Sequence, residues 1–229
     1  HVVVDEAQEL SAMAWRMLMR RCPTKSMTLV GDVAQTGSAA GASSWGSALG
    51  PHVGDRWRLA ELTVNYRTPG QVMRLATEVL RAAGVDAPAP TSAREGDFPP
   101  VARAISPEDT ADLVRGVLAE IDVLDGGKLA VITAATQTHS VYTALSTALP
   151  AGEVGHGAGS LDARVAVLSV TEAKGLEFDA VVLIEPARVL RESPRGANDL
   201  YVAITRPTQR LRVLHAEPLP GGFEAVVSA

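Results

Sequence analysis

The chain opens with an apolar segment that ends in two adjacent carboxylates. Residues 2–4 are all valine, and Asp5 and Glu6 follow them directly. Such a run predicts a buried parallel strand whose acidic end reaches the carboxyl edge of a sheet, where ligands bind in open α/β folds. An Asp there can hold Mg²⁺, directly or through water, while a neighbouring carboxylate deprotonates an attacking water. The alternative is an acidic pair that caps a helix, and this segment alone leaves the two interpretations even.

Composition narrows the class of protein. The 229 residues suffice for one large or two small domains, and 46% of them are apolar, which is ample for sizeable cores. No run approaches the roughly 18 apolar residues of a membrane span, and the chain starts with His1 rather than Met, so we expect a soluble fragment whose natural start is missing. Cys22 is the only cysteine, which fits a reducing, cytoplasmic setting. A net charge of −5 means that any contact with nucleic acid is local or depends on missing parts.

The segment after the first strand predicts a helix and a second strand. Apolar residues at helical spacing predict a helix over residues 11–20, with its Met and Trp side chains (Met13, Trp15, Met17) in the core. A strand is expected over residues 26–30. Gln35 then lies at the same sheet edge as Asp5, where an uncharged amide could report the presence of a γ-phosphate. An ordinary polar loop residue is the alternative, and the segment alone favours it.

Two aromatic residues stand in loops that precede helices or strands. Residues 36–50 are rich in Gly, Ala and Ser and predict a loop, in which Trp45 could stack on a nucleobase but is expected to fold back on the core. A short strand is expected over residues 57–62. Tyr66 and Arg67 then precede a predicted helix over residues 71–83, and suit either a base-stacking and phosphate-binding platform or a plain surface turn.

The rest of the chain alternates strands with helices. Residues 84–100 contain four prolines among Gly, Ser and Asp and predict a linker. The alternation beyond it predicts a parallel sheet with helices on both faces. No His or Cys stands at ligand spacing from His139 or His215, so metal binding there is not expected. The expected strands are 101–105, 128–133, 164–170, 180–184 and 210–215, the expected helices are 108–121, 139–149 and 198–205, and a Gly-rich loop is expected over 152–160.

The last two loops carry further candidate residues. Lys174 and Glu177 flank Gly175, where the backbone can approach a ligand closely. Arg206 ends the last predicted helix, and an arginine that faces a nucleotide from a second domain can neutralise charge in a transition state. A helix-terminal arginine is also favoured by the helix dipole alone.

In their order along residues 2–206, five segments resemble the motif series of superfamily 1 helicases of the UvrD type. VVVDEAQ is similar to motif II, LVGDVAQ to motif III, LTVNYR to motif IV, TEAKGLEFD to motif V and LYVAITR to motif VI. The resemblance implies RecA-like parallel sheets with helices on both faces and ATP between two domains. Residues 1–62 would be the C-terminal half of the first domain, and residues 63–229 would be the complete second domain, with a Pro/Gly-rich loop at 84–100.

The resemblance also implies a role for each motif residue, with ATP and Mg²⁺ as the cofactors. Asp5, with Glu6 beside it, would serve Mg²⁺, and Glu6 would activate water. Gln35 would sense the γ-phosphate. The remaining contacts to ATP would be Tyr66 on adenine, Arg67 and Arg206 on the γ-phosphate, Glu177 on the ribose, and Gly175 beside it.

The departures from the family pattern concern phosphate binding and DNA binding. No G-x-x-x-x-G-K-[ST] occurs, so we expect the chain alone to be inactive and to need an N-terminal half of the same protein that supplies this loop. Only 107 positions separate Arg67 from Lys174, too few for the domain inserted in UvrD-type helicases. The Tyr-x-Trp-Arg-Gly continuation of motif III is absent. The weak candidates left for nucleic-acid contact are Trp45, Ser169 and Thr171, the last two at positions where those helicases usually show Thr and His.

The segments GDVAQTGSAAGASSW and VTEAKGLEFD are similar to the HelD-like branch of the superfamily. That resemblance implies an ATPase of transcription that binds RNA polymerase and releases it from stalled or inactive complexes. A UvrD/Rep-type translocase on single-stranded DNA is the second hypothesis. A non-catalytic polymerase-binding module is the third, against which the intact motif residues argue.

Overall fold

The computed structural model describes the chain except for residues 86–89, 107–108, 125 and 229. The backbone divides into two compact units, His1–Glu61 and Leu62–Ala229. Each unit has its own sheet and its own buried core, so each is described by itself. Within the described residues, no helix is both long enough and apolar enough to cross a membrane.

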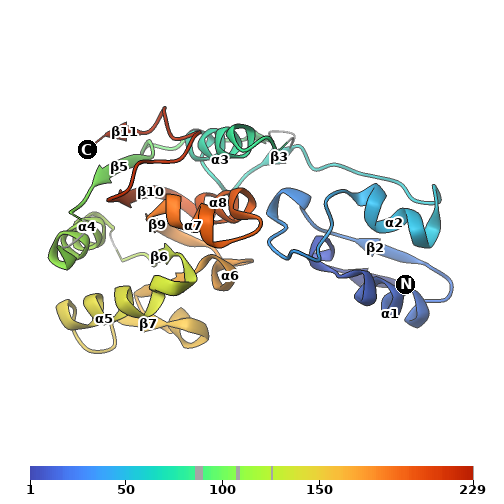
Figure 1. The fold of residues 1–229 in the computed structure, drawn as a ribbon, viewed down its shortest axis with the longest axis horizontal. Coiled ribbons are helices and arrows are strands. Elements are labelled where there is room, and N and C mark those ends of the chain that lie inside the picture. Colours follow the sequence, from blue (N-terminus) through green and yellow to red (C-terminus); the bar gives the residue numbers. More distant parts are fainter. Residues whose placement is uncertain (86–89, 107–108, 125, 229) are drawn as a thin grey trace. The chain divides into compact units, whose positions relative to one another are not determined.

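The first unit is built on two short parallel strands that end at the same edge. Val3 of one strand lies opposite Thr28 of the other, and a single turn of 3₁₀ helix follows each strand. Both strands expected from the sequence are thereby confirmed. In chain order the elements are β1 (Val2–Val4), η1 (Ala7–Glu9), α1 (Ala12–Arg21), β2 (Met27–Leu29), η2 (Val33–Gln35) and α2 (Trp45–Val53) (Figure 1).

Helix α1 is confirmed, but the prediction that its methionines are core residues is wrong. Met13 and Met17 are exposed, whereas Trp15 is buried in the core of the first unit. Leu18 and Met19 pack against the same core. They lie three and four residues after Trp15, which places all three on one helix face and turns Met13 and Met17 to the opposite face.

The prediction of a loop over residues 36–50 is wrong at its end, because α2 begins at Trp45. Ser44 caps this helix by accepting a hydrogen bond from the backbone N–H of Ser47 (3.1 Å). Leu49 is buried in the core of the first unit, and Trp45 is half-buried against the same core. Small residues carry no periodic pattern of their own, so the cap and one buried leucine define a helix that the composition conceals.

The strand expected over residues 57–62 is also wrong, since that stretch has no regular structure. The nearest strand is β3 (Val64–Asn65), which pairs in parallel with β4 (Thr91–Ser92). Strand β4 lies inside the stretch that was expected to be a linker. The side chain of Gln71 exchanges two hydrogen bonds with the backbone of Gly96 (2.6 and 2.7 Å), so the described part of the stretch after β4 is fastened to a helix.

A seven-stranded parallel sheet forms the centre of the second unit, in the order β11-β5-β10-β9-β6-β8-β7. The neighbouring strands β9, β6 and β8 are made almost entirely of buried Val, Ile, Leu and Ala, as expected of strands covered on both faces. All five strands predicted beyond residue 100 are present. The seven are β5 (Val101–Ala104), β6 (Leu129–Thr133), β7 (Val154–His156), β8 (Val165–Ser169), β9 (Phe178–Ile184), β10 (Pro207–His215) and β11 (Val227–Ser228).

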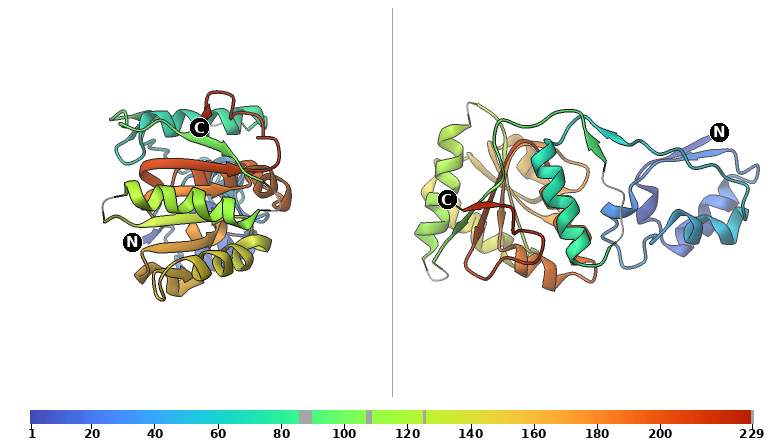
Figure 2. Two further views of the ribbon diagram at one scale, coloured as in Figure 1. Left: turned by 90° about the vertical axis from the view of Figure 1, so that its left-hand side faces the viewer. Right: turned by 90° about the horizontal axis from the view of Figure 1, so that it is seen from above.

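Helices cover both faces of this sheet (Figures 1 and 2). Helices α4 and α5 pack on one face, where Val131 and Val182 join their common core. Helices α3 and α8 lie on the other face, and α6 and α7 contact α8. The helices are α3 (Gly70–Ala82), α4 (Thr110–Val123), α5 (Thr138–Ala148), α6 (Val170–Ala173), α7 (Pro186–Glu192) and α8 (Gly196–Ile204).

The Gly-rich loop expected over residues 152–160 is instead an edge strand followed by the 3₁₀ turn η4 (Gly157–Asp162). Val154 pairs with Val165 of β8, and a side chain at Gly155 would overlap Ser160. The glycine therefore permits close packing between the strand and the turn. Neither α6, α7 nor β11 is expected from the sequence, since each is short or at the end of the chain.

Candidate functional site

In the first unit, Asp5 and Glu6 lie at the carboxyl end of β1 with exposed side chains. The Asp5 carboxylate accepts a hydrogen bond from the backbone N–H of Glu6 (2.9 Å). Glu6 adopts a left-handed conformation (φ 50°, ψ 35°), which costs a residue other than glycine about 1–3 kcal/mol. Backbone strain of this kind persists only where the surroundings enforce it, and it concentrates at functional sites.

A buried glutamine, Gln8, holds the Glu6 side chain through a hydrogen bond. Gln8 is completely buried, and its side-chain amide donates a hydrogen bond to Glu6 Oε2 (2.5 Å). The carbonyl end of the same side chain accepts from the backbone N–H of Asp32 (3.2 Å), just after β2. Gln8 is part of the VVVDEAQ segment, but no role was assigned to it from the sequence. The sequence holds no signal for this role, because the burial of Gln8 is visible only in the structure.

Asp32 continues the same network to Gln35. One Asp32 oxygen accepts from the backbone N–H of Ala34 (2.9 Å), and the other accepts from the side-chain amide of Gln35 (2.9 Å). Glu6 and Gln35, proposed separately from the sequence, are thus joined through Gln8 and Asp32. The structure brings these two candidate residues into one polar network at the edge of β1 and β2.

The carboxylates at this edge fit a Mg²⁺ ion that is shared with a phosphate ligand. Mg²⁺ in nucleotide sites takes one or two protein carboxylates and completes its octahedron with water and phosphate oxygens. Asp5 and Glu6 offer such a pair, both exposed. Over the described ranges there is no cluster of three or more His, Cys, Asp or Glu side chains that could enclose a metal without other ligands.

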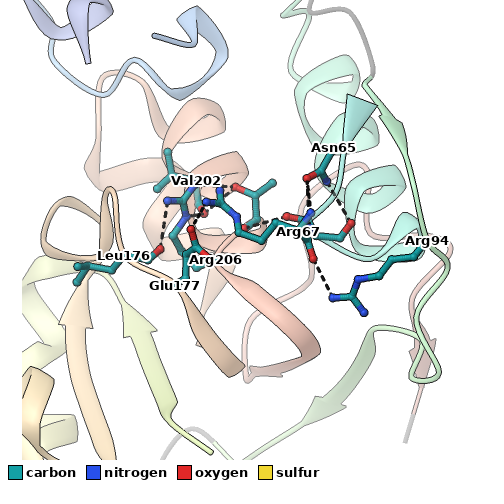
Figure 3. A network of polar contacts seen from close by, with 9 residues as sticks. Asn65, Arg67, Arg94, Leu176, Glu177, Val202 and Arg206 are labelled. Carbon is teal, nitrogen blue, oxygen red and sulfur yellow. Dashed lines mark hydrogen bonds and ion pairs between the residues drawn. The ribbon is translucent and has the colours of Figure 1, made fainter. Parts of the chain in front are cut away.

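In the second unit, three contacts tie together three segments that are far apart in the sequence (Figure 3). Arg67 forms an ion pair with Glu177. The hydroxyl of Thr68, the next residue, donates to the backbone carbonyl of Thr205 (3.3 Å). Arg206 in turn donates to the backbone carbonyl of Leu176 (3.3 Å), the residue before Glu177. The candidate residues Arg67, Glu177 and Arg206 therefore lie in a single closed network.

The turn that carries Tyr66 and Arg67 is shaped by Asn65. The side-chain oxygen of Asn65 accepts hydrogen bonds from the backbone N–H groups of Arg67 (3.1 Å) and Thr68 (3.2 Å). The side-chain amide of Asn65 donates to the backbone carbonyl of Thr68 (3.1 Å). Arg94 adds a hydrogen bond to the Arg67 carbonyl (2.8 Å). Tyr66 is 75% exposed on this fixed turn, so its ring is available to a planar ligand.

The two arginines of this network differ in burial. The Arg67 side chain is 39% exposed, although its Nε is buried and makes no hydrogen bond to the described part of the protein. Arg206 is only 2% exposed. Its Nε donates to the Val202 carbonyl (3.0 Å) and one Nη to the Thr205 hydroxyl (3.2 Å), so these bonds cap the end of α8. These contacts give Arg206 a structural role at the end of α8 that was not expected from the sequence, whereas a role toward phosphate stays a prediction.

Gly175 and Glu177 border open space on the same loop. Gly175 has φ 72°, and no heavy atom lies within 4 Å of the position that a Cβ would take. The left-handed backbone therefore explains the glycine, and crowding does not. Glu177 is 47% exposed beside it. Both residues are accessible to a ligand.

Two of the three candidates for nucleic-acid contact have structural roles. Ser169 caps α6, where its side chain and that of Glu172 form a capping box. Burial, the largest influence, raises the pKa of Glu172, but the hydrogen bonds from Ser169 and the charge of His156 together lower that pKa below its ordinary value. Thr171 is exposed in the same helix, and Trp45 is half-buried against the core of the first unit.

Comparison with known proteins relates residues 164–214 of the second unit to a helicase domain. No curated protein matches the chain. A solved structure, the C-terminal domain of a possible DNA helicase from Lactobacillus plantarum WCFS1, is 23% identical and covers 71% of this chain and 94% of its own, with a TM-score of 0.53. At that identity the likeness concerns the fold, a mixed α/β arrangement around a large parallel sheet. Residues 164–214, which include Ser169, Glu177 and Arg206, match the family model of the UvrD-like helicase C-terminal domain.

Proposed function

We propose that the chain is part of the ATP-hydrolysing motor of a superfamily 1 helicase-type protein. The observation that carries the proposal is the closed network of the second unit, in which Arg67, Glu177 and Arg206 meet from three distant segments. A match of residues 164–214 to a helicase family supports it independently. In this proposal residues 1–62 are part of one RecA-like domain and residues 63–229 form a second.

The residues of the first unit would act on water and on the metal. Glu6 would orient and deprotonate the attacking water, Asp5 would hold Mg²⁺ directly or through water, and Gln35 would report the γ-phosphate. Mg²⁺, when bound, supplies positive charge that stabilises the transferred phosphoryl group. The exposed carboxylates at the end of β1 and the amide of Gln35 at the end of η2 suit these tasks.

The residues of the second unit would bind the nucleotide. The exposed Tyr66 ring would stack on adenine, and Glu177 would accept a hydrogen bond from a ribose hydroxyl. Gly175 would let the backbone come close to the nucleotide. Arg67 would meet the γ-phosphate by exchanging its partner Glu177 for phosphate oxygens, because guanidinium binds both oxyanions with the same geometry. Arg206 would need to become more exposed to do the same, because it is only 2% exposed and its Nη groups already donate to Leu176 and Thr205.

We further propose a HelD-like role, in which the motor acts on RNA polymerase complexes in the cytoplasm and releases polymerase from them. The segment after motif III supports this branch. In UvrD-type helicases this part of the sequence contacts DNA, whereas here it forms α2 and packs Trp45 against the core of the first unit. The match to a UvrD-like domain favours the alternative, a translocase on single-stranded DNA.

Steady-state ATP turnover by the full-length protein tests the proposal. We expect turnover that Glu6→Gln lowers by about 100-fold or more, since a general base contributes about 10²–10⁴-fold. Glu61→Gln, an exposed position of the same unit, is the control and should leave turnover unchanged. Stimulation by RNA polymerase without stimulation by single-stranded DNA supports the HelD-like role. Strong stimulation by DNA supports the translocase, and a complete lack of turnover would show that the module is not catalytic.

A further inference from the structure

Gln8 is the only link that the described hydrogen bonds provide between the Glu6 carboxylate and the segment after β2. Its side chain is completely buried and uses both ends, the amide toward Glu6 Oε2 (2.5 Å) and the carbonyl toward the backbone N–H of Asp32 (3.2 Å). A buried amide that satisfies both ends is fixed in one orientation, because a flip would oppose donor to donor and acceptor to acceptor.

Gln8 is closely packed against the backbone of Gly31. A Cβ built on Gly31 would overlap Gln8 Oε1 and would also crowd the ring of Trp45 (3.1 Å). The backbone of Gly31 and Asp32 thus lies directly against the amide. Any displacement of Asp32 must therefore move Gln8 or break its hydrogen bond, since packed interiors do not deform gradually.

The far end of the link is Gln35, the last residue of η2. Asp32 holds the Gln35 amide through Oδ2 (2.9 Å) and the turn of η2 through Oδ1 (2.9 Å). Glu6 itself is held in a left-handed conformation that it would not adopt unaided. A ligand that draws Gln35 away from Asp32 would alter a path that ends on the Glu6 carboxylate.

We propose that Gln8 is a positioning residue that couples Gln35 to Glu6, so that the carboxylate reaches its working orientation only when Gln35 has met the γ-phosphate. The inference rests on the proposed ATPase function and deepens it. Gln8 itself touches no substrate and acts through Glu6.

The kinetic test uses Gln8→Met, which keeps the volume of the side chain and removes both hydrogen bonds. In the full-length protein we expect kcat to fall by about 10- to 100-fold, as for other residues that orient a reacting group, with KM for ATP changed less than about two-fold. Ser11→Ala, which removes the N-cap bond of α1 (3.2 Å) in the same unit, is the control for lost stability and should leave both constants unchanged. Gln35→Ala should lower kcat far less in the Gln8→Met background than in the native one; independent, multiplicative effects would overturn the coupling.

A second measurement does not depend on turnover. The side-chain amide resonances of Gln8 in the 229-residue chain should shift on Gln35→Ala and stay in place on Gln71→Ala, which removes a glutamine bonded to Gly96 in the second unit. Unmoved Gln8 resonances on Gln35→Ala would overturn the proposal even if the protein hydrolyses ATP. Shifted resonances in a protein without turnover would uphold the link and refute the proposed ATPase.

Discussion

Arg67 and Glu177 form an ion pair although 110 residues separate them in the sequence. Both side chains are more than a third exposed, so solvent screens the attraction and the pair contributes little to folding. In the proposed function, this pair is the meeting point of two ligand-binding side chains and not a structural fastening. This distinction can be measured.

Glu177→Gln should change the free energy of unfolding by less than about 1 kcal/mol, because the lost pair is exposed. In the full-length protein it should raise KM for ATP by about 10-fold, the loss expected for one hydrogen bond to a charged group. Urea unfolding and ATP titrations measure the two effects. The control is Glu95→Gln, which removes a more exposed pair with Arg74 and should leave KM unchanged. Equal KM values for native protein and Glu177→Gln would remove Glu177 from the nucleotide site.

Ser169→Ala should destabilise the second unit by about 1 kcal/mol, since it removes the cap of α6. The effect should depend on pH. Because the folded state lowers the pKa of Glu172, the stabilisation is present above the ordinary pKa of a glutamate and is lost as the pH falls through the lowered value. Thermal unfolding between neutral pH and about pH 4 should show a smaller pH dependence in the variant. Thr171→Ala, exposed in the same helix, should match the native protein in this pH dependence.

Gly31→Ala should destabilise the first unit by about 1–3 kcal/mol, because the added methyl group overlaps the buried Gln8 amide and the structure must shift. Gly46→Ala is the matched substitution. Apart from its neighbours in the chain and the backbone of its own helix, no heavy atom lies within 4 Å of the new Cβ, and the position is inside α2, where alanine is favoured over glycine by about 0.5–1 kcal/mol. Chemical unfolding should therefore shift in opposite directions for the two variants. A shift in the same direction would mean that the packing around Gln8 is looser than described.

Glu120→Gln should destabilise the second unit by about 3–5 kcal/mol. The Glu120 carboxylate is 1% exposed and pairs with both Arg210 and Arg212, so the variant leaves two partly buried guanidinium groups without a counter-charge. Denaturant unfolding gives the value. Glu217→Gln, which breaks a more exposed pair with Arg191, should cost no more than about 1 kcal/mol.

Much of the second unit could be predicted because its strands have a strong local signal. Segments such as Leu129–Thr133 and Phe178–Ile184 are nearly continuous apolar runs. Such runs are typical of strands that are covered on both faces, because both sets of side chains are then buried. The edge strand Val154–His156 could not be predicted, because it is only three residues long and has Gly155 and His156 in place of an apolar run. The same holds for α2, whose small residues have no periodic pattern.

The candidate site shows the same division. The rule that parallel strands end at one edge predicted that Gln35 lies near the acidic end of β1, and the structure joins Glu6 to Gln35 in one network there. It could not reveal Gln8, since a buried glutamine and a surface glutamine look alike in a sequence. Nor could it reveal that Arg206 is buried and donates to the carbonyl of Leu176, 30 residues away in the chain.

The burial of Arg206 has a consequence for genetics. The Arg206 side chain is both a candidate ligand of phosphate and a buried cap of α8, so a substitution that removes the guanidinium group removes both. In a mutational scan, position 206 should therefore behave as a core position, with every substitution lowering cellular abundance. Position 67, on its exposed turn, should instead tolerate substitution in abundance while losing activity. Comparing the abundance score with the activity score at positions 67 and 206 separates a residue that the fold requires from one that only the chemistry requires.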